Sequence, residues 1–313
     1  MMHKIPTPDD PFRIGTRGSP LALWQAHETR RSLMTALALP QAAFEIVIIK
    51  VMGDQILDRA LKDIGGKGLF TREIEEALLA GNIDIAVHSM KDMPTVQPEG
   101  LILDCYLPRE DVRDAFVSPR AARLEDLPQG ARVGSSSLRR RAQLAHRRPD
   151  LQLVEFRGNV QTRMNKLNDG VADATFLAMA GLNRLGMAQV ARGAIAVDVM
   201  LPAVAQGAIG IERRISDNRA KEMLDAIHHG PTGVQLAAER AFLSQLDGSC
   251  ETPIAGLAVL EGGALWLRGE ILRPDGSRVI AGEIRGAAAD GAALGAKLAE
   301  DLLKRAGAGF FDD

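Results

Sequence analysis

The sequence predicts an α/β protein with a small antiparallel α+β domain at its C-terminal end, and two observations lead to this prediction. Over the first two thirds of the chain, short β-rich runs alternate with helical stretches, the pattern of open sheets covered by helices. In the last third, β-rich runs at 264–272 and 278–284 flank Pro274-Asp275-Gly276-Ser277, a hairpin signature, and an Ala/Leu-rich helical stretch follows to Arg305.

Two helix starts can be placed within the α/β part. Ser19-Pro20 is an N-cap residue followed by proline at the first helical position, and Asn159 opens a stretch with apolar residues at helical spacing. Ligands of α/β sheets bind at the carboxyl ends of strands, so the loops that follow the strands are where we look for chemistry. The predicted strands are 12–16, 44–51, 83–87, 151–156 and 174–177.

The chain has 313 residues, enough for two or three domains that each bury a core. Breaks at 108–114 and near Gly230-Pro231 divide it into three. We predict a discontinuous first domain of residues 11–107 and 208–225, a second of 113–201, and a third of 230–313.

Composition and charge exclude several classes of protein. Hydrophobic residues make up 46% and charged residues 25%, so disorder, collagen and coiled coil are ruled out. Lys and Arg number 38 against 40 Asp and Glu, and this balance creates no overall field that would attract nucleic acid or an anionic membrane. Any basic site must be local.

Cysteine usage and hydropathy predict a cytoplasmic protein. Cys105 and Cys250 are too few for a disulfide framework and lack the paired spacing of a zinc site, so we expect no metal. Residues 1–10 have no apolar core of a signal peptide, and the longest uncharged apolar run, 199–211, is too short and too broken by Gly and Pro to span a bilayer.

A local basic cluster lies at 132–166, where nine Lys and Arg residues stand against two acidic residues, a local charge of +7. Ser135-Ser136-Ser137 followed by Arg139-Arg140 places hydroxyls, free N–H groups and guanidinium groups at a predicted helix N-terminus, and Arg157-Gly158-Asn159 repeats the arrangement one strand later. Because an arginine fork matches a carboxylate or phosphate two bonds at a time, these loops indicate a ligand with several such groups. Arg147 and Arg148 are expected on a solvated helix face.

The glycine-rich stretch Gly65-Gly66-Lys67-Gly68 is not a nucleotide loop, because Gly68 stands where a P-loop needs Ser or Thr. We interpret 53–68 as a glycine-hinged lid with one lysine, and an ordinary surface loop is the alternative.

Two further loops carry reactive side chains. Asp92, beside Lys91 at the end of a buried-looking strand, is placed to stabilise a cationic intermediate and pass protons, and a simple salt bridge is the alternative. His88 is expected to be structural. Cys250 lies in a Gly/Ser loop where covalent chemistry is possible, whereas Cys105 sits in an apolar strand and is expected to be buried.

Seven ordered stretches of the chain carry a family resemblance: RIGTRGSPLA (13–22), GGKGLF (65–70), VHSMKDMP (87–94), GSSSLRR (134–140), RGNVQTR (157–163), LPAVAQG (201–207) and GSC (248–250). In this order they resemble the porphobilinogen deaminase (hydroxymethylbilane synthase) family over nearly the whole chain. The lysine that the family often has just before the lid glycines is shifted by one position in this chain, so Lys62 is left out of the site. Gly18 and Ser135 are small departures from the family pattern.

The resemblance implies a fold and a reaction. Two domains that resemble periplasmic binding proteins would form a cleft, and a third would present Cys250 on a loop. A dipyrromethane cofactor, built from the enzyme's own substrate, would be joined to Cys250 by a thioether. The enzyme, a monomeric transferase of tetrapyrrole and heme biosynthesis, would deaminate porphobilinogen, couple four units head to tail onto this primer and release hydroxymethylbilane and ammonia.

The resemblance also assigns site residues. Every pyrrole brings an acetate and a propionate, which the basic residues would bind, and Asp92 would stabilise the azafulvenium cation left by loss of ammonia. Cofactor binding would involve Cys250, Lys91, Asp92, Ser137, Arg139 and Arg140; substrate binding would involve Arg17, Ser19, Lys67, Ser89, Arg157, Arg163 and Arg184.

Two other classes of function remain open. A two-lobed binding protein or sensor could close on an anionic ligand with the same arginines, but this explains neither Asp92 nor Cys250. A nucleic-acid binder using 132–166 is disfavoured, because aromatic residues are only 4% and none is interleaved with the arginines for stacking.

Overall fold

The structure is a computed structural model that describes residues 5–55, 71–248 and 252–311. These residues form two compact units. The first contains residues 5–55, 71–109 and 208–233, and the second contains 110–207, 234–248 and 252–311. Among the described helices, none is long and apolar enough to cross a membrane.

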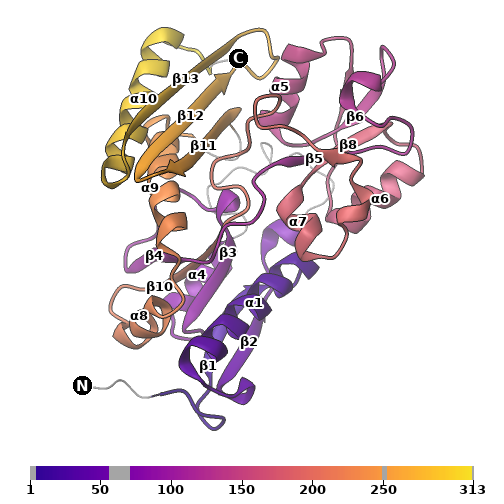
Figure 1. Ribbon diagram of the computed structural model, residues 1–313. Coiled ribbons are helices and arrows are strands. Elements are labelled where there is room, and N and C mark those ends of the chain that lie inside the picture. The colour runs from indigo at the N-terminus through magenta and orange to yellow at the C-terminus, as the bar shows by residue number, and fades with distance from the viewer. Residues whose placement is uncertain (1–4, 56–70, 249–251, 312–313) are drawn as a thin grey trace. The chain divides into compact units, whose positions relative to one another are not determined.

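The first unit is built on a five-stranded sheet with the strand order β2-β1-β3-β10-β4 (Figure 1). Strand β1 (Phe12–Arg17) runs parallel to β2 (Phe44–Ile49) and to β3 (Ile85–Ser89), so the carboxyl ends of these strands share one edge. Strand β10 (Ile209–Arg214) runs antiparallel between β3 and β4 (Leu101–Tyr106).

Helices cover both faces of this sheet, which explains why β3 is buried on both of its faces, with Ile85 and Val87 in one core and Ala86 in the other. Helices α1 (Pro20–Leu37) and α8 (Asn218–Asp225) contribute Leu33 and Leu224 to the core on one face. Helix α4 (Arg72–Leu79) buries Ile74 and Leu78 in a second core, and the short α2 (Met52–Gln55) follows β2.

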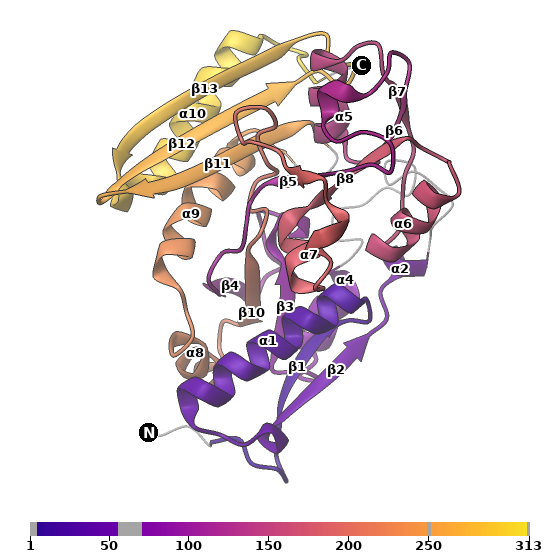
Figure 2. The ribbon, with the colours of Figure 1, turned by 45° about the vertical axis from the view of Figure 1, so that its right-hand side comes forward.

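The second unit contains a five-stranded sheet with the order β7-β6-β8-β5-β9. Figure 2 shows β7, β6, β8 and β5. Strand β6 is parallel to β7 and β8, and β5 is antiparallel to β8 and β9. Helices α5, α6 and α7 each follow a parallel strand. The bounds are β5 (Asp114–Val117), β6 (Arg132–Gly134), α5 (Leu138–Arg147), β7 (Gln152–Val154), α6 (Val160–Asn168), β8 (Ala174–Ala178), α7 (Met179–Arg184) and β9 (Gly193–Ala194).

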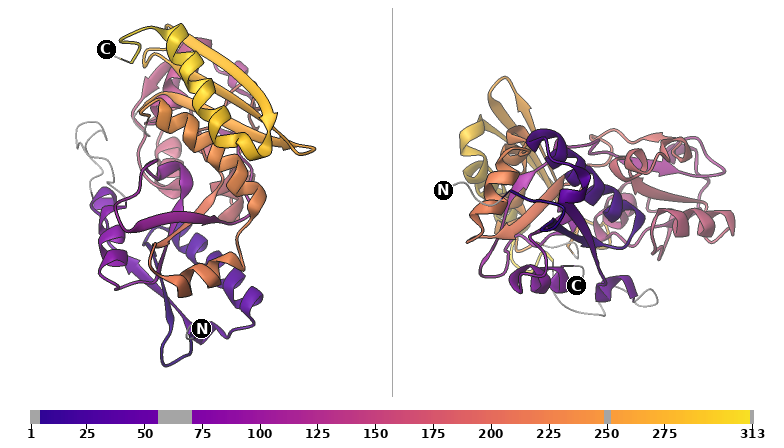
Figure 3. Two further views of the ribbon diagram at one scale, coloured as in Figure 1. Left: turned by 90° about the vertical axis from the view of Figure 1, so that its left-hand side faces the viewer. Right: turned by 90° about the horizontal axis from the view of Figure 1, so that it is seen from below.

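The C-terminal part of the second unit is a three-stranded antiparallel sheet of β11 (Ile254–Glu261), β12 (Ala264–Leu272) and β13 (Val279–Ala287). Helix α10 (Gly291–Ala306) lies along one face of it, together with α9 (Gly230–Gln245) (Figure 3). The two helices pack closely because Gly295 has no side chain: a Cβ there would overlap the carbonyl oxygen of Ala238. The predicted class, mixed α/β with a separate C-terminal antiparallel sheet, is confirmed.

Most predicted elements exist, but several end elsewhere, and pairing explains the difference. Strand β2 stops at Ile49 instead of residue 51, because Ile49 pairs with Arg17, the last residue of β1. Strand β3 extends to Ser89 instead of 87, because β10 pairs with it through Ile209. Both predicted helix starts are confirmed, with Ser19 capping α1 and Asn159 capping α6.

Candidate active site

Five predicted site residues of the first unit gather at the edge where β1 and β3 end. Arg17 is the last residue of β1, and the hydroxyl of Ser19 accepts a hydrogen bond from the N–H of Ala22 (3.3 Å) at the start of α1. Ser89 is the last residue of β3, and a 3₁₀ turn, Met90–Asp92, follows it directly. Because β1 and β3 are parallel, the sequence places both groups at the same edge.

The turn that carries Lys91 and Asp92 is anchored on both sides. The side-chain amide of Gln25 in α1 contacts the Ser89 hydroxyl through its Nε2 (2.8 Å) and its Oε1 (3.1 Å). The Met90 N–H donates to the carbonyl of Ala208 (3.1 Å), and the Met90 side chain is buried. Lys91 and Asp92 are exposed, so a fixed turn presents a carboxylate and an ammonium group to solvent.

Immediately before the turn, His88 is buried and its Nε2 lies 3.1 Å from Oε2 of the buried Glu212. The prediction that His88 is structural is confirmed. Burial raises the pKa of the nearby Glu75, and the Glu212 carboxylate adds to this, while Thr71 and His88 act in the opposite direction.

In the second unit, the predicted anion-binding loops lie at the carboxyl ends of β6 and β7, which are parallel neighbours. Ser137 caps α5, its hydroxyl accepting from the N–H of Arg140 (3.4 Å), and the Ser136 hydroxyl accepts from the N–H of Phe156 (3.0 Å). Asn159 caps α6 by accepting from the N–H of Thr162 (2.9 Å). The sequence therefore brings two helix N-termini, with their partial positive charge, to one edge.

Arg157 and Arg163 are half-buried at this edge. Arg163 Nε donates to the carbonyl of Gly158 (2.9 Å), and Lys166 Nζ donates to the carbonyl of Arg157 (3.0 Å). These bonds fix the loop that follows β7 while leaving basic side chains partly open to solvent.

Arg139 and Arg140 are only 4% and 5% exposed. This is deeper burial than we expect for two arginines predicted to bind a ligand. Both contact Asp114: Arg139 Nη2 to Oδ2 (2.8 Å) and Arg140 Nη2 to Oδ1 (2.7 Å). Burial alone would raise the pKa of Asp114, but the two guanidinium groups hold it well below its usual range. Burial lowers the pKa of Arg139, an effect that Asp114 opposes.

Arg184, at the end of α7, is also buried and donates from Nη2 to the carbonyl of Gly207 (2.7 Å). Burial lowers its pKa to about 10, with the carboxylate of Glu110 opposing the shift. Its predicted role in substrate binding stays a prediction, and its described contact is with the main chain.

Arg148 departs from the expected solvated helix face. It is half-buried, pairs with Asp150 (Nε to Oδ1, 2.7 Å) and donates to the carbonyls of Leu124 (3.1 Å) and Leu127 (3.0 Å). Arg147 is exposed, as expected. The charge run therefore contains one residue that fixes the loop before β6.

Cys250 and Lys67 lie outside the described residues. Cys105 is buried, and its Sγ lies 3.5 Å from the carbonyl of Leu224. The predicted burial of Cys105 is confirmed, and burial raises the pKa of its thiol to about 12. Within the described ranges, no group of three or more His, Cys, Asp or Glu side chains is arranged to hold a metal.

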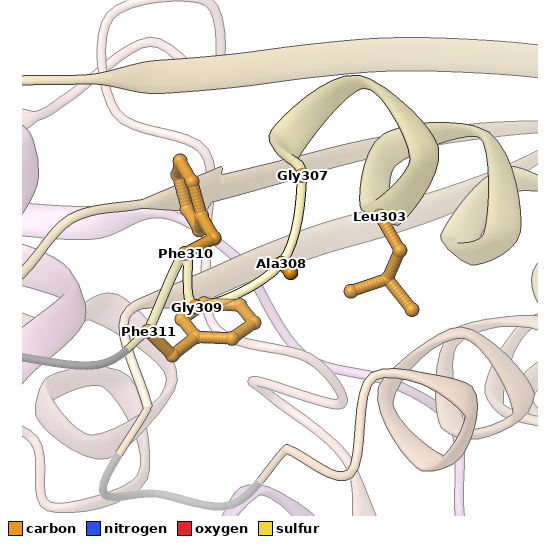
Figure 4. A pocket seen from close by; sticks show the side chains of 6 residues that line it. All are labelled: Leu303, Gly307, Ala308, Gly309, Phe310 and Phe311. Carbon is orange, nitrogen blue, oxygen red and sulfur yellow. The ribbon is translucent and has the colours of Figure 1, made fainter.

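A surface pocket near the C-terminal end has no relation to the predicted site. It is lined by Leu303 and the segment Gly307 to Phe311, and it contains no charged side chain (Figure 4). None of the predicted site residues contributes to it.

Sequence reasoning missed Asp114 and Gln25. Asp114 stands in an apolar strand far from the arginines in sequence, and Gln25 is one polar residue inside α1. A buried-looking strand that begins with an acidic residue was the available signal for Asp114; nothing comparable marked Gln25.

Comparison with known proteins shows to which family the chain belongs. The model of the porphobilinogen deaminase, dipyromethane cofactor binding domain matches residues 12–222, and that of the porphobilinogen deaminase C-terminal domain matches 234–304. The chain belongs to the porphobilinogen deaminase family. It is 70% identical over 311 residues to the porphobilinogen deaminase of Paracoccus denitrificans (strain Pd 1222), covering 99% of each chain. It is 55% identical over 308 residues to the chloroplastic enzyme of Pisum sativum, covering 96% of this chain and 83% of that protein.

The predicted family is therefore confirmed, and the chain is a transferase of tetrapyrrole biosynthesis that makes hydroxymethylbilane. Residues 12–222 include both five-stranded sheets, and 234–304 include the three-stranded one. Among solved structures, the chain is similar to a periplasmic substrate-binding protein of an ABC transporter from Coxiella burnetii, with a TM-score of 0.43 and 14% identity over 73% of this chain and 96% of that one.

Proposed function

We propose that the enzyme assembles hydroxymethylbilane on a dipyrromethane primer held by a thioether to Cys250. The observation that carries this proposal is the anchored turn after β3, which presents Lys91 and Asp92 to solvent beside the end of β1. When bound, the primer supplies the nucleophilic pyrrole carbon to which each new unit is joined. The chain's own residues must then bind carboxylates, hold the reacting rings and move protons.

The chemistry of the donor sets fits such a primer. Acetate and propionate groups need positive charge and N–H donors, which the second unit supplies at the N-termini of α5 and α6 together with Arg157 and Arg163. Ser137, Arg139, Arg140, Lys91 and Asp92 would hold the primer. Arg17, Ser19, Lys67, Ser89, Arg157, Arg163 and Arg184 would hold the incoming porphobilinogen.

Of the two cysteines in the chain, Cys250 is the one whose thiol we expect to form the thioether. A thioether forms from a thiolate that its electrophile can reach. Cys105 does not meet this requirement, because its thiol is buried and its pKa is raised to about 12. Cys250 is the other cysteine of the chain.

Asp92 would act on the substrate. Loss of ammonia from porphobilinogen leaves a cation whose charge spreads onto the pyrrole ring, and a nearby carboxylate stabilises that charge. The same oxygen can take a proton from the coupled product, since Asp92 is exposed on a turn that is anchored by the bonds of Gln25 to Ser89 and of the Met90 N–H to Ala208.

We also propose three domains with the predicted bounds, a monomer, and a cytoplasmic location. The free buried Cys105 suits a reducing compartment, and the separate three-stranded sheet suits a third domain.

The intact mass of the denatured protein tests the proposal, with Cys250→Ser alongside. A covalent primer survives unfolding, whereas a bound ligand does not. We expect an excess equal to a dipyrromethane in the parent and none in the variant. If the parent has a bare mass that does not change after incubation with porphobilinogen, covalent priming is wrong and a protein that only binds the anion is favoured.

A further inference from the structure

Asp114 is a fully buried carboxylate at the first residue of β5, and it lies between the two deepest arginines of the predicted site. Its Oδ2 accepts from Arg139 Nη2 (2.8 Å), and its Oδ1 accepts from Arg140 Nη2 (2.7 Å). Antiparallel pairing with β8 sets Asp114 opposite Ala178, so it lies at the same edge as the loops that follow the parallel strands.

The remaining terminal nitrogens of these arginines are also used by the protein. Arg139 Nη1 donates to Gln143 Oε1 (3.0 Å) and to the carbonyl of Leu201 (2.9 Å), and Arg140 Nη1 donates to the carbonyl of Phe176 (2.8 Å). Only the two Nε atoms have no hydrogen-bond partner among the described residues. Each guanidinium group is therefore held at both ends and cannot rotate without breaking a charged hydrogen bond.

Charge explains why a carboxylate is needed at this place. Two buried cations side by side repel each other, and a buried charge without a partner is strongly unfavourable. One carboxylate between them leaves the trio with a single net positive charge. That remaining charge adds to the partial positive charge of the α5 N-terminus, where Ser137 caps the helix.

The carboxylate is itself fixed by a neutral side chain. Gln206 Nε2 donates to Asp114 Oδ1 (2.9 Å) and to the carbonyl of Val112 (2.8 Å). Gln206 lies in the segment that leads from β9 to β10, so three separate parts of the chain meet at Asp114: α5, β5 and this segment.

We propose that Asp114 is a positioning residue for primer binding: it orients Arg139 and Arg140 and sets their combined charge without touching the ligand. This inference rests on the proposed role of the two arginines. Asp114 is 0% exposed, so it acts through the arginines.

The test compares Asp114→Asn with Asp84→Asn as a matched control. Asp84 is also buried and contacts two arginines, Arg13 (Nη2 to Oδ1, 3.2 Å) and Arg214 (Nη2 to Oδ1, 3.7 Å). It precedes β3, at the end opposite Ser89, and it belongs to the first unit. Both variants remove one buried carboxylate from an arginine pair, so both are expected to lower the melting temperature.

Two readouts separate positioning from a general loss of stability. In primer-free protein, the ¹⁵N-detected Nη–H signals of Arg139 and Arg140 that exchange slowly in the parent should be lost or broadened in Asp114→Asn and kept in Asp84→Asn. After addition of porphobilinogen, primer assembly followed by intact mass should be at least about tenfold slower in Asp114→Asn, the scale of losing one charge-assisted contact. Asp84→Asn should assemble at the parental rate.

Parental assembly and parental Nη–H signals in a folded Asp114→Asn protein would overturn the proposal, as would an equal slowing in both variants. If Asp114→Asn does not fold, Gln206→Met takes its place, because this change removes the hydrogen bond from Gln206 to Asp114 without changing any charge. Gln206→Met should slow primer assembly. A parental rate of assembly in this variant would overturn the proposal. If the parent itself never forms an adduct, the proposed function fails, and the Nη–H signals still decide whether Asp114 orients the arginines.

Discussion

The side chain of Met90 occupies the space that the missing side chain of Gly210 leaves open on the neighbouring strand. A Cβ at residue 210 would overlap the sulfur and Cγ of Met90. Met90 is the first residue of the turn that carries Asp92, so the absence of a side chain on β10 lets this turn lie flat against the sheet.

Gly210→Ala should therefore displace the turn. We expect a loss of about 1–3 kcal/mol of unfolding free energy from overpacking, and a fall in turnover because Asp92 moves with Met90. Chemical denaturation and steady-state turnover measure the two effects. Gly193→Ala, at an exposed glycine outside the left-handed region where a Cβ meets nothing within 4 Å, controls for the backbone change. If Gly210→Ala lost stability but kept full turnover, the packing of Met90 against Gly210 would not be needed to position Asp92.

Asp92→Asn should keep the shape of the turn and remove its charge. Removing one electrostatic stabiliser of a transition state costs roughly 10²–10³ in kcat, about 3–4 kcal/mol. We expect this loss with an unchanged melting temperature, since Asp92 is exposed. Single-turnover assays on protein that already carries its primer make the measurement. Near-parental kcat would remove Asp92 from the reaction.

Glu75 should make stability depend on pH. Because its pKa in the folded protein is raised, mainly by burial, the folded state holds this proton more tightly than the unfolded chain. Its stabilising contribution is present at low pH and is lost as pH rises through the folded pKa. Glu75→Gln should thus gain stability relative to the parent at about pH 8 but little at about pH 5. Denaturant titrations at both pH values test this, with the exposed Glu76→Gln as control; equal effects at both pH values would contradict it.

Cys105 should resist alkylation in the folded protein. Its thiol is buried and its pKa is raised to about 12, so almost no thiolate is available near neutral pH. In Cys250→Ser, iodoacetamide should add no mass to the folded protein and one group after unfolding. Rapid labelling of folded Cys250→Ser would show that Cys105 is accessible, and the argument for Cys250 would lose its support.

The elements that could be predicted from sequence are those with local signals. The N-caps Ser19 and Asn159 and the turn at Gly276, which has a φ of +74°, depend on neighbouring residues alone. The loops that carry the predicted site residues could be assigned to one edge of the sheet in each unit. This assignment needs only the order of strand, loop and helix along the chain.

The features that could not be predicted from the sequence depend on pairing between residues that are distant along the chain. The partnership of Asp114 with Arg139 spans 25 positions, and that of His88 with Glu212 spans 124. No periodicity marks either pair, so the burial of Arg139 and Arg140 could not be predicted, and a surface role was the natural expectation for a run of arginines.

Strand β10 also has a consequence for how the chain acquires its structure during synthesis. It lies between β3 and β4, so the ribosome must produce residues 107–208, including the whole five-stranded sheet of the second unit, before the first sheet can be completed. Until then, one edge of β3 is unpaired and β4 has no strand partner in this sheet. The five-stranded sheet of the second unit can form while the sheet of the first unit is still incomplete. The unpaired strands of the nascent first unit are the segments that a chaperone would need to shield.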